Sequence, residues 1–239
     1  MAFYSDFAGH YEKIFPLRPE VMAFLDRRLP ARGRILDVGC GTGDACAALD
    51  RSGRRSLGID LDPGMIDRAE QRHPEGQFRL MGMEEIGLLS RSTFAGAICL
   101  GNVLPHLPGD RLADFLLDVK RLLIPGGIWI FQTVNFDPIL MSGVREHAFA
   151  DLKIPQDDLV FQRWYKDIEP NRLTFGTRLS ARGREIFQGE VELSPCASLE
   201  YVLGHQAAGF QLLGHFADYR ERPFVPHEQS GSVFVWRLG

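Results

Sequence analysis

Short apolar runs alternate with amphipathic stretches over residues 19–134, whereas residues 3–19 are rich in aromatic side chains and are expected to be irregular. Stretches with apolar side chains at helical spacing occur at 19–29, 44–51 and 110–123, and a fourth begins at Pro63 after the capping residue Asp62. Between them lie five runs with the length and composition of buried strands, at 34–38, 56–60, 78–83, 95–100 and 128–134. Strands that alternate with helices favour a parallel sheet covered on both faces, so we expect a doubly wound α/β fold.

The pattern changes after residue 135. Residues 159–193 alternate apolar and polar side chains, with turn signals at 169–171 and 182–184. This alternation predicts a small antiparallel sheet at 155–195, inserted into a single domain of residues 1–239. The α/β pattern then resumes with a predicted helix at 199–208 and predicted strands at 210–217 and 233–238.

The composition is that of an ordinary globular protein. The chain has 239 residues, is 45% hydrophobic and 24% charged, and carries a net charge of −4. Its cationic residues are mostly scattered arginines, which we interpret as a solvated surface, so no nucleic-acid partner is expected. No apolar run approaches 18 residues and the first residues do not resemble a signal peptide, so no membrane association is predicted.

The cysteines and histidines indicate neither disulfides nor a metal site. Cys40, Cys46, Cys99 and Cys196 form no C-x-x-C pair, and we interpret them as free thiols in a reducing compartment. The cytoplasm is therefore the expected location. No H-E-x-x-H run or Cys/His cluster is present in the sequence, so no metal is expected.

The stretch RILDVGCGTGDA, residues 34–45, places three glycines directly after the first predicted strand. Gly39, Gly41 and Gly43 precede a predicted helix. Glycine is used where the backbone turns tightly or another group approaches it, and strand, glycine turn and helix form the first half of a nucleotide-binding unit. A nicotinamide-dependent oxidoreductase is an alternative, although it would have G-x-G-x-x-G and the third glycine here comes one residue too early.

Two later stretches add to this picture. SLGIDLDPGM places Asp60 at the end of the second predicted strand, where a carboxylate can accept hydrogen bonds from both hydroxyls of a ribose. The alternative is that Asp60 only caps a turn. RLLIPGGIWIFQT ends a predicted helix with Pro-Gly-Gly before the fifth predicted strand.

In this order and spacing, D-V-G-C-G-T-G, G-I-D-L-D-P-G-M and L-L-I-P-G-G resemble the class I S-adenosylmethionine-dependent methyltransferases over about residues 34–134. L-G-N-V-L-P-H-L is similar to a run in their glycine/sarcosine N-methyltransferase subgroup. The resemblance implies a Rossmann-like seven-stranded, mostly parallel sheet in the order 3-2-1-4-5-7-6, with the last strand antiparallel. It also implies S-adenosylmethionine as the cofactor and S-adenosylhomocysteine as the product.

The resemblance also implies positions around the cofactor. It places Asp37, Gly39 and Gly41 at the amino-acid end, Asp60 at the ribose and Leu61 beside adenine. Many relatives have an acidic residue where this chain has Gly82, which leaves the adenine contact to the backbone or to Glu84. Tyr11 either closes the cofactor site or is a plain core aromatic. The full set of implied cofactor-binding residues is Tyr11, Asp37, Gly39, Cys40, Gly41, Asp60, Leu61, Met83, Leu100, Gly101 and Asn102.

We expect methyl transfer to a nitrogen or oxygen of a small molecule. Such transfer needs a nucleophile placed in line with the carbon–sulfur bond and the exclusion of water, so no catalytic triad is expected. A dedicated base is needed only if the substrate arrives protonated. The candidates for a catalytic role are Asn102, His106 and Tyr165, and His106 is alternatively only a helix-start residue. A catalytically inactive cofactor-binding or scaffold protein of the same fold is the alternative from another class.

The inserted strands are expected to roof the active site and to select the substrate. Trp164 and Tyr165, with the loop around Arg145 and His147, supply aromatic and cationic side chains suited to a pocket. The alternative is that the strands form a dimer contact or a stabilising flap.

Overall fold

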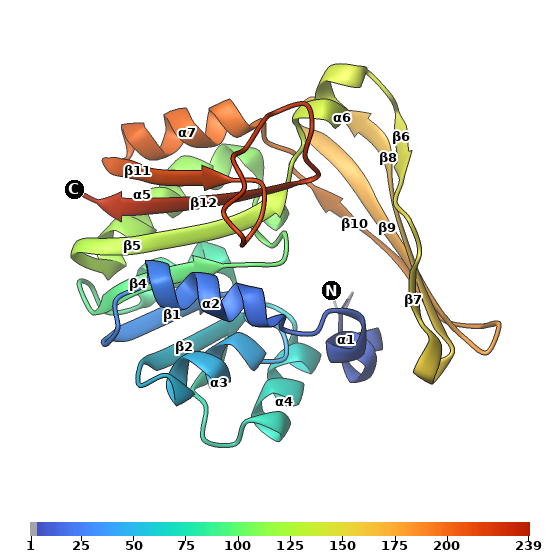
Figure 1. Ribbon diagram of the computed structural model, residues 1–239, viewed down its shortest axis with the longest axis horizontal. Coiled ribbons are helices and arrows are strands. Elements are labelled where there is room, and N and C mark those ends of the chain that lie inside the picture. The colour runs from blue at the N-terminus through green and yellow to red at the C-terminus, as the bar shows by residue number, and fades with distance from the viewer. Residues whose placement is uncertain (1–3) are drawn as a thin grey trace.

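The larger sheet of the molecule has seven strands (Figure 1). The computed structural model describes residues 4–239, apart from the side chain of Asp6. The strand order is β11-β12-β5-β4-β1-β2-β3, and β12 runs antiparallel to both of its neighbours. The order 3-2-1-4-5-7-6 is therefore confirmed. The strands are β1 (Arg34–Val38), β2 (Arg55–Asp60), β3 (Phe78–Leu80), β4 (Phe94–Cys99), β5 (Leu123–Val134), β11 (Phe210–Phe216) and β12 (Gly231–Leu238).

Helices cover both faces of this sheet because its strands bury side chains on both sides. Ile35 and Ile98 pack with α2 and α3 on one face, whereas Leu36 and Cys99 pack with α5 and α7 on the other. All six residues of β4 are buried, as expected for a central strand of a parallel sheet. The helices around the sheet are α2 (Pro19–Arg28), α3 (Asp44–Arg51), α4 (Pro63–Arg72), α5 (Leu112–Leu122) and α7 (Ser198–Ala207). None of the helices within residues 4–239 is long and apolar enough to cross a bilayer.

Two local expectations from the sequence need correction. The predicted strand at 78–83 ends at Leu80, and the short 3-10 helix η2 (Met83–Leu88) follows. The Glu85 carboxylate accepts a hydrogen bond from the Gly82 N–H at 2.8 Å, which starts this helix and ends the strand. The N-terminal stretch, expected to be irregular, forms η1 (Ser5–Phe7) and the helix α1 (Ala8–Ile14).

A second, antiparallel sheet stands at the carboxyl-end edge of the first, with α1 between the two sheets (Figure 1). Its order is β10-β9-β8-β6, and β7 also pairs with β8. The sheet begins at Glu146, earlier than the expected 155, because two short strands join it. Its strands are β6 (Glu146–Ala148), β7 (Leu152–Ile154), β8 (Leu159–Glu169), β9 (Arg172–Ala181) and β10 (Arg184–Leu193). The remaining elements are α6 (Asp137–Ser142), η3 (Leu104–His106), η4 (Gly109–Arg111) and η5 (Pro155–Asp157).

The face of the second sheet that points toward the first sheet packs in two apolar clusters. In the cluster that we call the N-terminal cluster, Phe7 and Ile14 pack against residues of β8, β9 and β10, which are Leu159, Phe161, Leu179 and Phe187. In the α6 cluster, Phe136 and Ile139 pack against Tyr165, Ile168, Leu173 and Leu193. Residues 4–14, which we call the N-terminal segment, are thus held between the two sheets.

Candidate functional site

The glycine turn after β1 has a backbone that few other residues adopt. Gly39 and Gly41 have φ angles of +74° and +53°. A Cβ on Gly39 would lie 2.4 Å from Val103 Cγ1, whereas a Cβ on Gly41 would have its nearest neighbour, Tyr11 Cε1, at 3.5 Å. Gly39 is therefore required by packing as well as by conformation, while Gly41 leaves its open side toward Tyr11.

Asp60 ends β2 and fixes the glycine turn. Its Oδ2 accepts a hydrogen bond from the Gly41 N–H at 2.9 Å, and its Oδ1 accepts one from the Asp62 N–H at 2.9 Å. Burial raises the pKa of this carboxyl. The carboxylate also lines a cavity, and each oxygen keeps a lone pair for a further donor. Asp60 therefore combines the turn-capping position with the exposure to a cavity that ribose binding requires.

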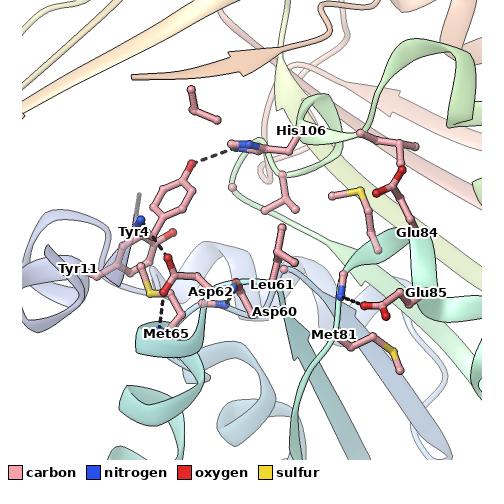
Figure 2. A pocket seen from close by; sticks show the side chains of 18 residues that line it. Tyr4, Tyr11, Asp60, Leu61, Asp62, Met65, Met81, Glu84, Glu85 and His106 are labelled. Carbon is pink, nitrogen blue, oxygen red and sulfur yellow. Dashed lines mark hydrogen bonds between the residues drawn. The ribbon is translucent and has the colours of Figure 1, made fainter. Parts of the chain in front are cut away.

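A cavity of about 320 Å³ lies beside Asp60 (Figure 2). Its walls are mostly apolar, and its polar side chains are four carboxylates, two tyrosines and one histidine. The apolar lining residues are Leu61, Met65, Met81, Met83, Val103, Leu107 and Val191. The carboxylates are Asp60, Asp62, Glu84 and Glu85. Glu85 already accepts a hydrogen bond from the Gly82 N–H. Glu84, the other glutamate that lines this cavity, makes no such hydrogen bond among the described residues.

A second cavity of about 570 Å³ lies on the other side of the glycine turn. It shares Tyr11, Gly39, Gly41 and Gly101 with the first cavity, so the two form one elongated site around the turn. Asp37, Cys40 and Leu100, all expected at the cofactor, line the second cavity.

The second cavity is lined by an acidic side chain, Asp37, and a basic one, Arg18. Asp37 is only 2% exposed, and burial raises its pKa to about 7, although the Cys46 thiol donates to its Oδ2 at 3.4 Å. Arg18, at the start of α2, lines the same cavity with a largely exposed side chain that pairs with Glu20 at 3.4 Å. A buried carboxyl and an accessible guanidinium in one cavity can hold the ammonium and the carboxylate of an amino acid.

The N-terminal segment closes the first cavity on one side. The backbone N–H groups of Tyr4 and Ser5 donate to Asp62 Oδ2 at 3.1 and 2.9 Å, and the Ser5 hydroxyl donates to Asp62 Oδ1. The Tyr4 hydroxyl lies 3.0 Å from His106 Nε2, as Figure 2 shows. Tyr4 and Tyr11 thus both line the cavity.

Sequence reasoning missed part of this arrangement. Tyr4 gave no signal, and Asp62 was identified only as the cap of α4, which it is, since its Oδ1 accepts from the Gly64 and Met65 N–H groups. An acidic cap that also binds a distant segment cannot be told from an ordinary cap by local sequence. Arg18 and Arg163, which line the second cavity, were also missed.

The three candidates for a catalytic role lie in different surroundings. His106 lines the first cavity, and burial lowers its pKa to about 4, so the imidazole is neutral at pH 7. Asn102 and Tyr165 contribute to the lining of neither cavity. Asn102 has a φ of +64°, and its Oδ1 accepts a hydrogen bond from the Val134 N–H at 2.8 Å. Tyr165 is 1% exposed, and burial raises its pKa while a side-chain hydrogen bond with Asn102 lowers it.

The structure places the residues expected in the roof at different positions relative to the two cavities. Neighbouring side chains of a strand point to opposite faces, so Tyr165 lies in the α6 cluster while Trp164 lies on the outer face. There Trp164 covers Gly176, where a Cβ would be 2.2 Å from its Cε2 atom. Arg145 and His147 also line neither cavity. The second sheet instead reaches the cavities through Leu152, Arg163 and Val191.

Comparison with known proteins agrees with this geometry. Residues 35–127 match the family described as a methyltransferase domain. Residues 35–127 are thus similar to a methyltransferase domain, and the fold is that of solved S-adenosylmethionine-dependent methyltransferases. The matched range covers β1 to the start of β5, so the second sheet lies outside the part of the chain that the family description covers.

Three individual proteins illustrate the likeness. The ubiquinone biosynthesis O-methyltransferase of Paracidovorax citrulli is 30% identical over 136 residues, which are 54% of this chain and 56% of that protein. The chain thus spans only a little over half the length of that relative. An S-adenosylmethionine-dependent methyltransferase from Clostridium acetobutylicum superposes with a TM-score of 0.80 at 16% identity, covering 99% of both chains. S-adenosylmethionine-bound CalS10, an amino pentose methyltransferase from Micromonospora echinaspora, superposes with a TM-score of 0.67 at 18% identity, covering 99% of this chain and 92% of CalS10.

Proposed function

We propose that this protein transfers a methyl group from S-adenosylmethionine to an oxygen or nitrogen of a small molecule. The observation that carries the proposal is the elongated site around the glycine turn, with Asp60 at one end and Asp37 at the other. The family match and the names of the relatives support the same activity. The alternatives, a scaffold protein and a nicotinamide-dependent oxidoreductase, have no comparable support.

The two cavities suit the two halves of the cofactor. The first cavity offers Asp60 to the ribose hydroxyls and an apolar slot between Leu61 and Met83 to the adenine ring. The second offers Asp37 to the ammonium group and Arg18 to the carboxylate of the methionine part. Asp37, Gly39, Cys40, Gly41, Leu100 and Gly101 then follow the chain of the cofactor between these ends.

The chemistry asks little of the protein beyond placement. The sulfonium of the bound cofactor supplies an already activated methyl group. Gly101, whose N–H donates to Gln132 Oε1 at 2.9 Å, lies where the two cavities meet, beside Tyr11. The acceptor atom is held at this junction, and the N-terminal segment excludes water from it.

We assign His106 to positioning, not to proton abstraction. A general base works best when its pKa lies near the working pH, and a pKa of about 4 makes His106 a weak base at pH 7. Its Nε2 atom instead holds the Tyr4 hydroxyl at 3.0 Å and so fixes that ring over the cavity. We assign Asn102 and Tyr165, which line neither cavity, to support of the junction, where Asn102 Oδ1 accepts a hydrogen bond from the Val134 N–H.

The cysteines and the net charge of the chain bear on the cellular location and on the kind of methyl acceptor. The free cysteines of the chain, three of them buried, fit a reducing compartment, so we place the enzyme in the cytoplasm. A net charge of −4 and the mostly apolar cavity fit a small-molecule acceptor better than a nucleic acid.

Titration calorimetry combined with a product assay tests the proposal. The protein should bind S-adenosylmethionine and S-adenosylhomocysteine but not NAD, and should form S-adenosylhomocysteine when small metabolites are added. Binding without product in any metabolite pool would favour the scaffold alternative. Binding of NAD in place of S-adenosylmethionine would contradict the assignment.

A further inference from the structure

A polar row crosses the inner face of the second sheet between its two apolar clusters. Arg163 of β8 pairs with Thr177 of β9, which pairs with Gly189 of β10. Residues two positions away on one side belong to the N-terminal cluster, and those on the other side belong to or pack against the α6 cluster. This row thus carries a cation, a hydroxyl and a glycine where the neighbouring rows have large apolar side chains.

Two polar atoms of this row, one in Arg163 and one in Thr177, have no hydrogen-bond partner among the described residues. Arg163 Nη2 donates to the Ala150 carbonyl at 3.1 Å, and its guanidinium carbon lies 5.3 Å from the centre of the Phe149 ring. Its Nε is buried and has no hydrogen-bond partner among the described residues, and neither does Thr177 Oγ1. No described carboxylate lies within 4.0 Å of Arg163.

The side chain of Arg163 is half-buried, and among the described residues only the more distant Asp151 carboxylate favours its positive charge as a counter-ion. Burial lowers the pKa of Arg163, which means that its surroundings oppose the charged form. Buried charges in proteins are normally paired, because the loss of hydration is otherwise not offset. The protein nevertheless keeps Arg163 among aromatic residues with free N–H groups, an arrangement that an incoming anion would complete.

Arg163 faces the cavity from the side of the second sheet. It lines the second cavity with Gly101, Gln132 and Tyr11, where the acceptor atom is expected. On the proposed function, the ammonium and the carboxylate of the methionine part are met by Asp37 and Arg18, which come from β1 and the start of α2. The remaining charge of S-adenosylmethionine, the sulfonium, is positive, so no anionic group of the cofactor is left for Arg163.

We propose that Arg163 binds an oxyanion, a carboxylate or a phosphate, of the methyl acceptor. This inference rests on the proposed function and adds the class of its substrate. The planar guanidinium has free N–H groups for a two-point contact with two oxygens of such a group. The acceptor is therefore an acid or a phosphate ester, held by its anionic group at Arg163 while its nucleophilic atom reaches the junction at Gly101.

The first test separates the acceptors by charge. Small metabolites from the source organism are divided on a strong anion exchanger at pH 8, and each fraction is incubated with the protein and S-adenosylmethionine. Formation of S-adenosylhomocysteine is expected from the retained, anionic fraction. Product from the unretained fraction alone would overturn this inference and leave the proposed function intact, whereas no product from either fraction would overturn the proposed function. Phosphatase treatment of the retained fraction abolishes turnover for a phosphate and preserves it for a carboxylate.

The second test uses variants. Arg163→Gln is expected to raise the apparent KM for the retained fraction at least tenfold and to leave the Kd of S-adenosylhomocysteine within twofold. Arg163→Lys keeps the charge and should recover part of the loss. Arg178→Gln is the matched control, since Arg178 lies on the outer face and pairs with Glu185 at 3.3 Å. An unchanged KM in Arg163→Gln, or a tenfold weaker binding of S-adenosylhomocysteine, would overturn the inference, the latter by assigning Arg163 to the cofactor.

Discussion

At the scale of single residues, the site depends on carboxylates that have two tasks each. Asp60 holds the glycine turn and faces the first cavity, and Asp62 caps α4 and binds the N-terminal segment. The sequence reveals the first task of each, because turns and caps are local. The sequence does not reveal the second task, because the groups that these carboxylates contact there are distant in the chain. Substitutions at these positions must therefore be chosen so that the local task survives.

Asp60→Asn should weaken S-adenosylhomocysteine binding by about 1.5–3 kcal/mol, or roughly 10- to 150-fold, the usual loss for hydrogen bonds to a charged group. Asparagine keeps one acceptor oxygen for the turn, so the protein should still fold. Calorimetry gives the affinity, and Asp114→Asn, on the exposed side of α5, is the control. Equal affinities of the two variants would remove Asp60 from the ribose site.

Gly41→Ala separates the turn from the site. The new Cβ has room beside Tyr11, but it would occupy the wall that both cavities share. We expect a loss of about 1–2 kcal/mol of stability from the positive φ, together with at least a tenfold loss of cofactor affinity. Gly53→Ala has the same kind of strain, with φ of +90° and open space around it, and should change stability alone. Similar affinities in the two variants would mean that Gly41 serves only the turn.

Asp37 should couple cofactor binding to pH. Its pKa of about 7 in the free protein reflects burial, and the ammonium group of the cofactor would favour the ionised form and lower this pKa. Binding at pH 7 should therefore release protons, and the Kd should rise as the pH falls below 7. Titrations in two buffers of different ionisation enthalpy measure the release, and Asp37→Asn should abolish it. No proton release in the wild type would place the ammonium group elsewhere.

At the scale of elements, the hydrophobic pattern predicted most helices and strands. It did not predict where they end or which of their faces is turned toward the site. The alternation in β8 predicted a strand, yet it also sends Trp164 to the outer face and Arg163 to the inner one, which follows only when the inner face is known. The N-terminal elements η1 and α1 were not predicted because Phe7 of η1 packs on β8 and β10 and Ile14 of α1 lies in the same cluster, more than 140 residues away from its partners in the chain. Short helices of this kind are stabilised by tertiary packing more than by local propensity.

The N-terminal segment should control how long the cofactor stays bound. Ser5→Ala removes the hydroxyl that donates to Asp62 Oδ1 and accepts from the Gly64 N–H. We expect a several-fold faster dissociation of S-adenosylhomocysteine with a similar association rate, as measured by stopped-flow fluorescence. Thr93→Ala, which removes an exposed hydroxyl bonded to the Ser90 carbonyl, is the control. An unchanged dissociation rate would mean that the segment does not retain the cofactor.

At the scale of the whole molecule, the seven-stranded sheet and its strand order followed from three short motifs. The position of the second sheet did not, because it depends on contacts such as Phe7 with Phe187 and Phe136 with Tyr165, which join segments distant in the chain. The candidate site shows the same division. The residues of the glycine turn and β2 were named from the sequence, whereas Tyr4, Arg18 and Arg163 became visible only where the N-terminal segment and the second sheet meet the cavities.

A crystal structure of the complex with S-adenosylhomocysteine tests the central claim most directly. The ribose hydroxyls should lie within hydrogen-bond distance of Asp60, the adenine ring beside Leu61, the amino group at Asp37, and the sulfur atom near Gly101 at the junction of the two cavities. Arg163 should make no contact with the homocysteine carboxylate. A ligand bound outside the two cavities, or one that runs in the opposite direction with adenine at Asp37, would contradict the proposed function.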